Sequence, residues 1–477
     1  MTTITARTDS TFAAVGVAAA ALGVAVGLAL TIDIRLGVAL AFGALLAPIA
    51  LLDLPVVVAL WAALTVFSRV PGFGLATSAA AFLVLGAWIA HARTHRASIR
   101  ASLRIHRRLL ALVAVLLVWL TLSLAWSQDQ AAAASRLPYW YINGVALAIL
   151  LTSLRTPRDV RLVVIALVLS VLAALGLALA GIDLLPAKSV PDASPATDGR
   201  LQGAMGDPNF TAAMLVPVLV LCTVMRCAVR GRARSLLLPA AILLVLGLAM
   251  TQSRGGMLAA LAALIAAMAV MRGHRPAVFG VGAAALLTAA IYLLANPAGL
   301  ERIQSAEQDR GNGREDLWLV AQRMSGDNPV LGVGLANFTV RSREFVRQPG
   351  ALRYVDLVVD RPHAVHNTYL EMLAETGAVG LALFLAVVWS AVASAIRAGQ
   401  RFERAGNQAL ALVSRGVGVA NIGLLTAAIF ISAQGTATVW VLLALGPVLL
   451  GVACARSREP VRVSAAAPGP RRLTSVG

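Results

Sequence analysis

The sequence has little charge for its length, and nearly all of the positive charge comes from one residue type. Only 13% of its 477 residues are Asp, Glu, Lys or Arg. Acidic residues number 22 against 40 basic ones, and Lys188 is the only lysine. Hydrophobic residues make up 59% of the chain, well above the share in a soluble domain. This composition excludes an ordinary soluble globular protein and predicts a polytopic membrane protein.

Cysteine is almost absent. Cys222, Cys227 and Cys454 fall in or beside expected membrane spans, and they form no CxxC pair. A disulfide framework is therefore not expected, and we interpret all three as small buried side chains. The sequence also lacks an HExxH motif, a serine-nucleophile elbow and a phosphate-binding glycine loop, so we expect neither a metal nor a cofactor.

Long apolar runs fill most of the chain, and they predict an all-α fold. Because about 17 to 25 apolar residues cross a bilayer as a helix, we expect about 12 to 14 transmembrane helices. The first run lacks a small-residue cleavage site, so we expect it to remain as a helix. The expected spans are 12–31, 35–52, 53–70, 75–92, 108–126, 137–154, 159–180, 210–228, 235–252, 255–271, 276–295, 378–396, 409–431 and 435–455.

Arginine clusters set the expected orientation. They lie at 91–108, 226–234, 272–275 and 397–404, and the spans put all of them on one side together with both termini. By the positive-inside rule that side is the cytoplasm of a cytoplasmic (inner) membrane protein. The net charge of +18 is then a topology signal, with a minor role in contacts with anionic lipid. No basic-aromatic module accompanies it, so we expect no nucleic acid partner.

Two external segments interrupt the helices. The first is 181–209, and the second, 296–365, is a large loop in which 314–324 has the apolar spacing of a helix. One face of that helix would carry Leu317, Val320, Ala321 and Met324. The expected parts are an N-terminal transmembrane bundle 1–295, the loop 296–365, C-terminal transmembrane helices 366–455 and a disordered cytoplasmic tail 456–477.

Of the six histidines, only His363 and His366 are expected on the outer face. The others, His91, His95, His106 and His274, lie in arginine clusters, where we expect solvated side chains. A continuous helix would place His366 about 18 Å above Ala378, where the apolar run begins. A neutral imidazole at that interface can act as a general base, although a histidine that merely caps or hydrogen-bonds the loop is an equal alternative. Glu371 and Glu375 are interpreted as supporting residues or as partners of loop arginines.

Arg254 stands where positive charge is disfavoured, at an external turn between two spans. An arginine at the membrane edge is a functional hypothesis, and its planar fork suits phosphate oxygens. The alternative is a side chain that reaches lipid phosphate. We expect Gly255 and Gly256 to let a bulky headgroup approach the backbone.

Asp207-Pro208-Asn209 precedes another span, and there we expect Asn209 to cap the helix. Arg200, a few residues upstream, is a further external cation that would face an anionic ligand. The cap alone accounts for the motif without any chemistry.

Taken in order, these motifs resemble the O-antigen ligase and polymerase superfamily. The resemblance rests on Asp207-Pro208-Asn209, Ser253-Arg254-Gly255-Gly256, Gly313-Arg314 with Leu317-Trp318, Asn328-Pro329-Val330-Leu331-Gly332-Val333-Gly334 and His366-Asn367-x-Tyr369-Leu370-x-x-x-x-Glu375-x-Gly377. It implies a GT-C-like membrane glycosyltransferase that acts on the outer face without metal or nucleotide sugar. The implied donor is a glycan on undecaprenyl pyrophosphate. The implied acceptor is a lipid A core sugar, a growing polysaccharide or another surface acceptor.

The resemblance also implies roles for single residues. His366 matches the histidine proposed to activate the acceptor, while Arg254 and Arg314 match arginines proposed to bind the donor pyrophosphate. Arg200 matches a weaker donor-binding position and Asn209 a weaker supporting one. The other supporting residues would be Asn367, Tyr369 and Glu375.

Two other classes of protein are alternatives. A transporter or flippase for a lipid-linked saccharide would need ionisable groups near the bilayer midplane and an inverted repeat, and the sequence offers few of the first and no clear sign of the second. A non-catalytic component of polysaccharide export accounts for the helices but leaves Arg254, Arg314 and His366 unexplained. The choice between ligase and polymerase stays open.

Overall fold

The computed structural model describes Gly37 and residues 53–71, 73–182, 199–297, 313–348, 352, 355–359 and 363–456. Within these residues the protein is all-helical, as predicted. Nine of the described helices are long and apolar enough to cross a membrane, and Leu54–Phe67 and Arg254–Val270 are shorter apolar helices. The chain is thus a multi-pass membrane protein. The expected span 12–31, nearly all of 35–52 and the tail after 456 lie outside the described residues.

The helices follow the apolar runs, and every expected span from 53–70 onward overlaps one of them. In chain order they are α3 (Leu54–Leu64), η1 (Thr65–Phe67), α4 (Phe73–Thr94), α5 (Arg96–Ile105), α6 (Arg107–Leu122), η2 (Ser123–Ala125), α7 (Gln130–Ser153), α8 (Pro157–Leu179), η5 (Gly203–Met205), α9 (Pro208–Ala228), α10 (Arg232–Met250), α11 (Arg254–Val270), η6 (Arg272–His274), α12 (Arg275–Ala295), α15 (Arg314–Asp327), α16 (Phe338–Arg341), η7 (Ser342–Phe345), α17 (Asp356–Val359), α18 (Thr368–Arg404), α19 (Gln408–Ala427) and α20 (Ala437–Arg456). No expected span corresponds to α5, which is short and lies in the first arginine cluster.

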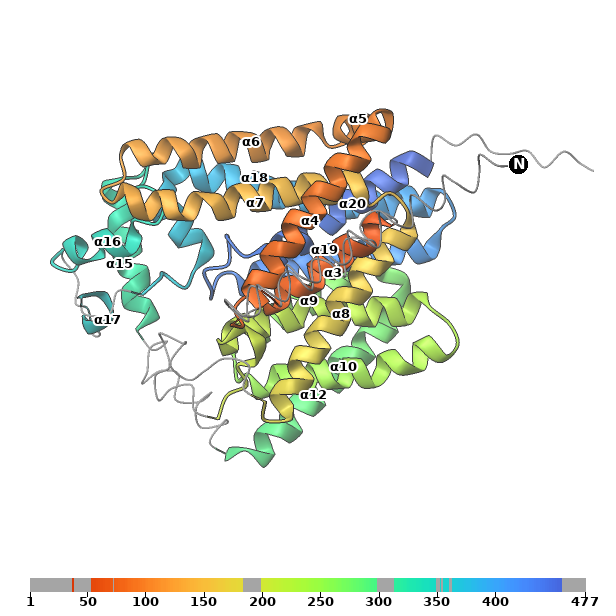
Figure 1. Ribbon diagram of the computed structural model, residues 1–477. Helices are drawn as coiled ribbons and strands as arrows, with labels where there is room; N and C mark the ends of the chain where they lie inside the picture. The colour runs from red at the N-terminus through yellow and green to blue at the C-terminus, as the bar shows by residue number, and fades with distance from the viewer. Residues whose placement is uncertain are drawn as a thin grey trace, which may run out of the picture.

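The bundle has two chemically different ends. Figure 1 shows α15, α16 and α17 at one end of α6 and α7, and α5 at the other. At the first end, called the loop end below, contacts join the starts of α9, α11, α15 and α18. At the second, the arginine end, α5 meets the last turns of α18 and α20, and the start of α8 meets the end of α9 and the start of α19.

Burial differs sharply between helices. Most residues of α9, α19 and α20 are buried, whereas α12 buries only Val278 and Gly282. A helix that is apolar on all sides and buried by its neighbours forms the centre of a bundle, so α20 occupies that place. A second, smaller core joins α15 and α17 to the start of α18. It contains the face predicted for 314–324, which is confirmed, although α15 continues to Asp327.

Gly377 interrupts α18 and corrects the expectation of an unbroken helix between His366 and Ala378. Its φ of 68° and ψ of −174° are not helical, and only glycine adopts them at little cost. The break frees backbone carbonyls of the preceding turn for partners outside the helix. The carbonyl of Glu375 accepts from the Gly334 N–H at 2.8 Å. The helix is broken because the segment 328–337 binds to it there.

The segment 328–337 also binds the turn between α6 and α7. The Asn337 side chain accepts from the Asp129 N–H at 2.8 Å and donates to the Asp129 carbonyl at 3.1 Å. The Leu335 N–H donates to Ser123 Oγ at 3.3 Å. A Cβ on Gly334, whose φ is 99°, would lie 2.0 Å from Ser127 Oγ. The glycine-rich motif is therefore a close backbone contact between α18 and the α6–α7 turn.

Gly377→Ala should destabilise the protein strongly. An added Cβ would lie 2.0 Å from the Val330 carbonyl oxygen and would force a left-handed φ on alanine, so the loss is about 2 to 5 kcal/mol. Gly406 is the matched control, because its φ is +74° but nothing lies within 4 Å of its Cβ position. Thermal unfolding in detergent should show a much lower Tm for Gly377→Ala than for Gly406→Ala. Equal Tm values would contradict the close contact.

His106 departs from the expectation of a solvated side chain. It lies between α5 and α6 and is only 4% exposed. Its ring packs on α20, where a Cβ on Gly451 would lie 2.9 Å from Nε2. Burial lowers the pKa of His106 to about 4. The imidazole is thus neutral at pH 7 and adds no charge to the arginine end, while His95 and His274 are exposed as expected.

Candidate functional site

Four helices begin at the loop end, and three of them have side-chain caps. Asp207 caps α9, Ser253 caps α11 and Asn367 caps α18, each with an oxygen that accepts from N–H groups of the first turn. α15 follows Gly313, whose φ is 81°, and has no side-chain cap. The expectation that Asn209 caps α9 is wrong, because Pro208 is the first residue of the helix and the cap precedes it.

Asn209 instead connects α9 with α11. Its Oδ1 accepts from Ser253 Oγ at 2.9 Å and from Arg200 Nη2 at 3.5 Å. Arg200 Nε donates to the carbonyl of Thr251 at 2.9 Å. Arg200 and Asn209 therefore hold the turn that carries Arg254, and a half-buried Arg254 begins α11 at this turn.

Gly255 and Gly256 serve packing, which corrects the expectation that they open the backbone to a headgroup. A Cβ on Gly255 would lie 2.7 Å from the ring of Phe430, and one on Gly256 would lie 2.5 Å from Cβ of Ala212. The two glycines let α11 lie close to α9 on one side and to the α19–α20 loop on the other. The Phe430 ring in turn lies 6.3 Å, centroid to centroid, from the ring of Trp318 on α15.

His366 lies just before α18, in a segment that contacts the α19–α20 loop and α15. Its φ of 54° is left-handed, which is uncommon outside glycine and marks a position that its surroundings enforce. The His366 N–H donates to Ser432 Oγ at 3.1 Å. The carbonyl of Val365 accepts from Trp318 Nε1 at 3.1 Å. Since Trp318 is one turn after Arg314 in α15, this bond places the His366 segment beside the helix that Arg314 begins.

The start of α18 also forms hydrogen bonds with the end of α19 and with the α19–α20 loop. Thr368 Oγ1 donates to the Ile431 carbonyl at 2.7 Å and accepts from the Ala433 N–H at 3.0 Å. The Tyr369 hydroxyl donates to the Leu425 carbonyl at 2.7 Å. These bonds fix the backbone on both sides of Asn367, so the imidazole of His366 projects from a rigid support.

Arg254 and Arg314 act on each other electrostatically, with Asp207 nearby. Burial lowers the pKa of the Arg314 guanidinium, the Asp207 carboxylate raises it, and Arg254 lowers it. Two guanidinium groups near one carboxylate leave an excess of positive charge in a region with little water. An anion bound between them would relieve that repulsion. The contacts of Phe430 and Trp318 join this pair to the His366 segment.

Two arginines at the same end were missed by the sequence analysis. The Arg69 guanidinium lies 4.3 Å over the Phe210 ring, and its Nη1 donates to the Met205 carbonyl at 3.2 Å. Loss of water on this stacked face lowers the pKa of Arg69, Asp207 raises it, and Arg136 lowers it. The sequence did contain a signal for both arginines. Arg69 lies at the end of one expected span and Arg136 directly precedes another, and both are on the side where positive charge is disfavoured.

Glu371 hydrogen-bonds the α19–α20 loop, which in turn positions His366. Its Oε1 accepts from Gln434 Nε2 at 2.6 Å, and its Oε2 accepts from Ser432 Oγ. Ser432 Oγ is the atom that receives the His366 N–H. The carboxylate thus orients a hydroxyl, and the hydroxyl orients the left-handed backbone.

Glu375 has a different task. It is 6% exposed, and its Oε1 accepts from the Phe338 N–H at 3.3 Å. It therefore fixes the start of α16 against α18. Among the described residues, neither Glu375 nor Glu371 forms a salt bridge with an arginine of the 296–365 loop.

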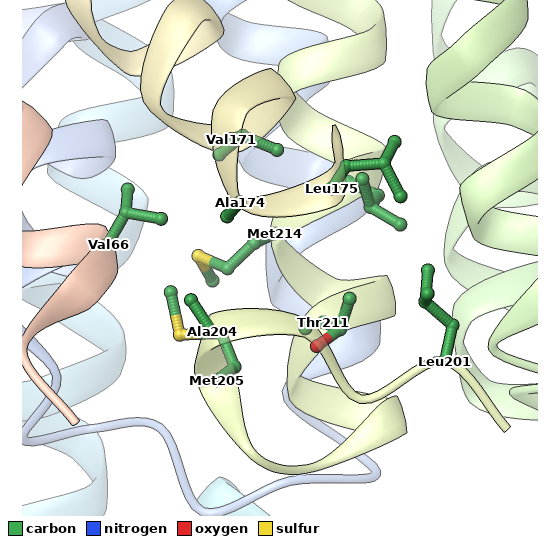
Figure 2. A pocket seen from close by; sticks show the side chains of 11 residues that line it. Val66, Val171, Ala174, Leu175, Leu201, Ala204, Met205, Thr211 and Met214 are labelled. Atoms are coloured by element: carbon green, nitrogen blue, oxygen red, sulfur yellow. The ribbon is translucent and has the colours of Figure 1, made fainter. Parts of the chain in front are cut away.

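A small cavity lies near this end between η1, α8, η5 and α9 (Figure 2). Figure 2 shows the side chains of Met205 and Met214 next to each other within it. Its volume is about 20 Å³ and its lining is almost wholly apolar. That is the space of about one water molecule, far too little for a lipid chain. We interpret it as a packing gap.

The geometry defines a multi-pass membrane protein with a histidine and several arginines gathered at one end of its helical bundle. The O-antigen ligase family model matches residues 239–385, from within α10 into α18. This match covers about a third of the chain and supports the resemblance of that part to the O-antigen ligase and polymerase superfamily. The matched range contains Arg254, Arg314 and His366. No curated protein matches the chain.

Proposed function

We propose that this protein transfers a glycan from undecaprenyl pyrophosphate to an acceptor hydroxyl. The observation that carries the proposal is the junction of His366 with the Arg254 and Arg314 pair inside the matched domain. The acceptor is a lipid A core sugar, a growing polysaccharide or another surface acceptor. On this proposal the loop end faces outward and the arginine end faces the cytoplasm of the inner membrane, as the positive-inside rule favours.

Arg254 and Arg314 bind the pyrophosphate of the donor. When the sugar–oxygen bond breaks, negative charge grows on the departing pyrophosphate, and two guanidinium forks in a region with little water stabilise it. The positive ends of the α11 and α15 dipoles add to this effect. Arg200 supports the site through Asn209 and Thr251, which position the turn before Arg254.

His366 activates the acceptor. Its neutral imidazole takes the proton of the acceptor hydroxyl while that oxygen attacks the anomeric carbon, and the bond from the anomeric carbon to the pyrophosphate oxygen breaks. Attack opposite the leaving group inverts the anomeric centre. Glu371 and Ser432 keep the His366 backbone in place during this step. No metal is needed, because the arginines supply the positive charge.

A transporter is the second candidate class, and the position of the site counts against it. Transport sites lie near the bilayer midplane, whereas Arg254 and Arg314 each begin a helix at the loop end and His366 directly precedes the start of another. A chemical step at the membrane edge accounts for this arrangement without a path across the bilayer.

The test is a transfer assay with purified full-length protein in lipid nanodiscs. We expect consumption of an undecaprenyl-pyrophosphate-linked glycan and release of undecaprenyl pyrophosphate, with the same rate in EDTA. Elongation with donor alone would identify a polymerase, and a strict need for an added glycan acceptor would identify a ligase. A donor joined through a single phosphate is the matched control and should react far more slowly. No consumption of donor with any acceptor class would contradict the proposal.

A further inference from the structure

A second cavity lies at the arginine end, remote from His366. Its volume is about 420 Å³, and it opens between α5, α18 and α20. That volume falls in the range of about 300 to 1,000 Å³ typical of ligand pockets. Its polar lining is Arg397, Gln400, Arg401 and Arg404, and its apolar lining includes Ile105 and Leu450.

The three arginines of this cavity have no counter-charge in the described part of the chain. Arg397, Arg401 and Arg404 lie four and three residues apart on α18, so they share one helix face. All three are exposed, and none forms a salt bridge there. Glu403, the acidic residue beside them, is paired with Arg415 of α19.

The helix dipole offsets only part of this charge. The C-terminal end of a helix carries about half of a negative charge, whereas three guanidinium groups gather at the last two turns of α18. The neighbouring α5 adds exposed Arg100 and Arg104. The chain after α20 has four arginines and one glutamate between 457 and 477, so its net charge is positive too. Among the described residues no carboxylate neutralises this arginine face, so the face is suited to an anion from outside the protein.

We propose that this cavity binds the headgroup phosphate of an anionic phospholipid. The arginine face of α18 contacts the phosphate oxygens, and Ile105 and Leu450 lie under the glycerol and the first acyl carbons. On the orientation given above, this end meets the inner leaflet, where anionic lipids and basic pockets between helices are found together. The bound lipid joins α5, α18 and α20. Binding requires none of the residues of the transfer site, so it is tested independently of catalysis.

Native mass spectrometry of delipidated protein measures this binding directly. With added phosphatidylglycerol, we expect one lipid to be retained by the wild type and its affinity to fall at least tenfold in the triple variant R397Q/R401Q/R404Q. The matched control is R230Q/R232Q/R234Q, which removes three exposed arginines at the same end and should keep the lipid. Phosphatidylcholine should not bind. An equal loss of lipid affinity in both triple variants would overturn the proposal, because the loss would then come from the lower total positive charge and not from this cavity.

Cysteine alkylation of the wild type gives a second measurement that does not depend on how well a variant folds. Cys454 lines the cavity and is partly exposed, and Cys227 is exposed elsewhere, so the expectation that all three cysteines are buried is correct only for Cys222. Phosphatidylglycerol should slow alkylation of Cys454 at least fivefold and leave Cys227 unchanged. Protection by inorganic phosphate alone, to the same degree, would overturn the lipid assignment in favour of a soluble anion. Unchanged alkylation of Cys454 with phosphatidylglycerol would overturn the site itself.

Discussion

His366→Asn should lower the rate of glycan transfer by about 10²- to 10⁴-fold, the usual contribution of a general base. Asparagine is the informative replacement, because His366 has a φ of 54° and asparagine tolerates the left-handed region better than other side chains. Alanine would remove the imidazole and strain the backbone together, so its loss of activity would have two causes. The measurement is the initial rate at saturating donor and acceptor, with Tm as a check of folding.

The nearby His363 provides the control for this prediction. His363→Asn removes an imidazole three residues away and should leave transfer within a few-fold of the wild type. The transfer rate of Glu371→Gln should lie between those of His366→Asn and His363→Asn. The substitution weakens the hydrogen-bond acceptor of the Ser432 hydroxyl but leaves the His366 ring intact. Near-normal transfer by His366→Asn would exclude His366 as the base.

The helices were predictable because their signal is local. Apolar runs of sufficient length must form helices in a bilayer, where each backbone polar group needs a partner within the segment. The face of α15 followed from spacing alone, and its residues are buried as predicted. The interruption of α18 at Gly377 was not predictable in this way, since its cause is a set of hydrogen bonds to the segment 328–337.

The choice of cap shows a similar limit. Asp207 and Asn209 are both good capping residues, and only the start of α9 at Pro208 decides between them. Proline favours the first turn of a helix, so the position of Pro208 was the signal that favoured Asp207.

The candidate site residues remain a prediction from sequence motifs, and their arrangement in space could not be predicted from those motifs. His366, Arg254 and Arg314 lie in three separate motifs, and their approach depends on Trp318 and Phe430. Three residues other than glycine have a positive φ in the described part of the chain, and all three are near these motifs: Gln252, Ala336 and His366. Such backbone strain is held by tertiary contacts, and no sequence pattern reveals it.

Arg254→Gln and Arg314→Gln should each lower transfer by about 10²- to 10³-fold, mainly in kcat, because charge on the leaving pyrophosphate grows as the transition state forms. Lysine at either position should restore part of the rate, since it keeps the charge but loses the planar fork. The double variant should lose less activity than the product of the two single fold-losses, because Arg254 and Arg314 act on each other. Steady-state kinetics with the lipid-linked donor measure both effects.

A charge-matched control separates donor binding from the general field of the loop. Arg347 is an exposed arginine in the 296–365 segment, which also contains Arg314, and Arg347→Gln should leave kcat unchanged. Inorganic pyrophosphate should inhibit the wild type and inhibit Arg254→Gln much more weakly, because the ion competes for the same guanidinium groups. If pyrophosphate inhibited both proteins equally, Arg254 would not contact the donor phosphates. The loss of rate would then reflect the contacts that Arg254 and its turn make with Asn209 and Phe430.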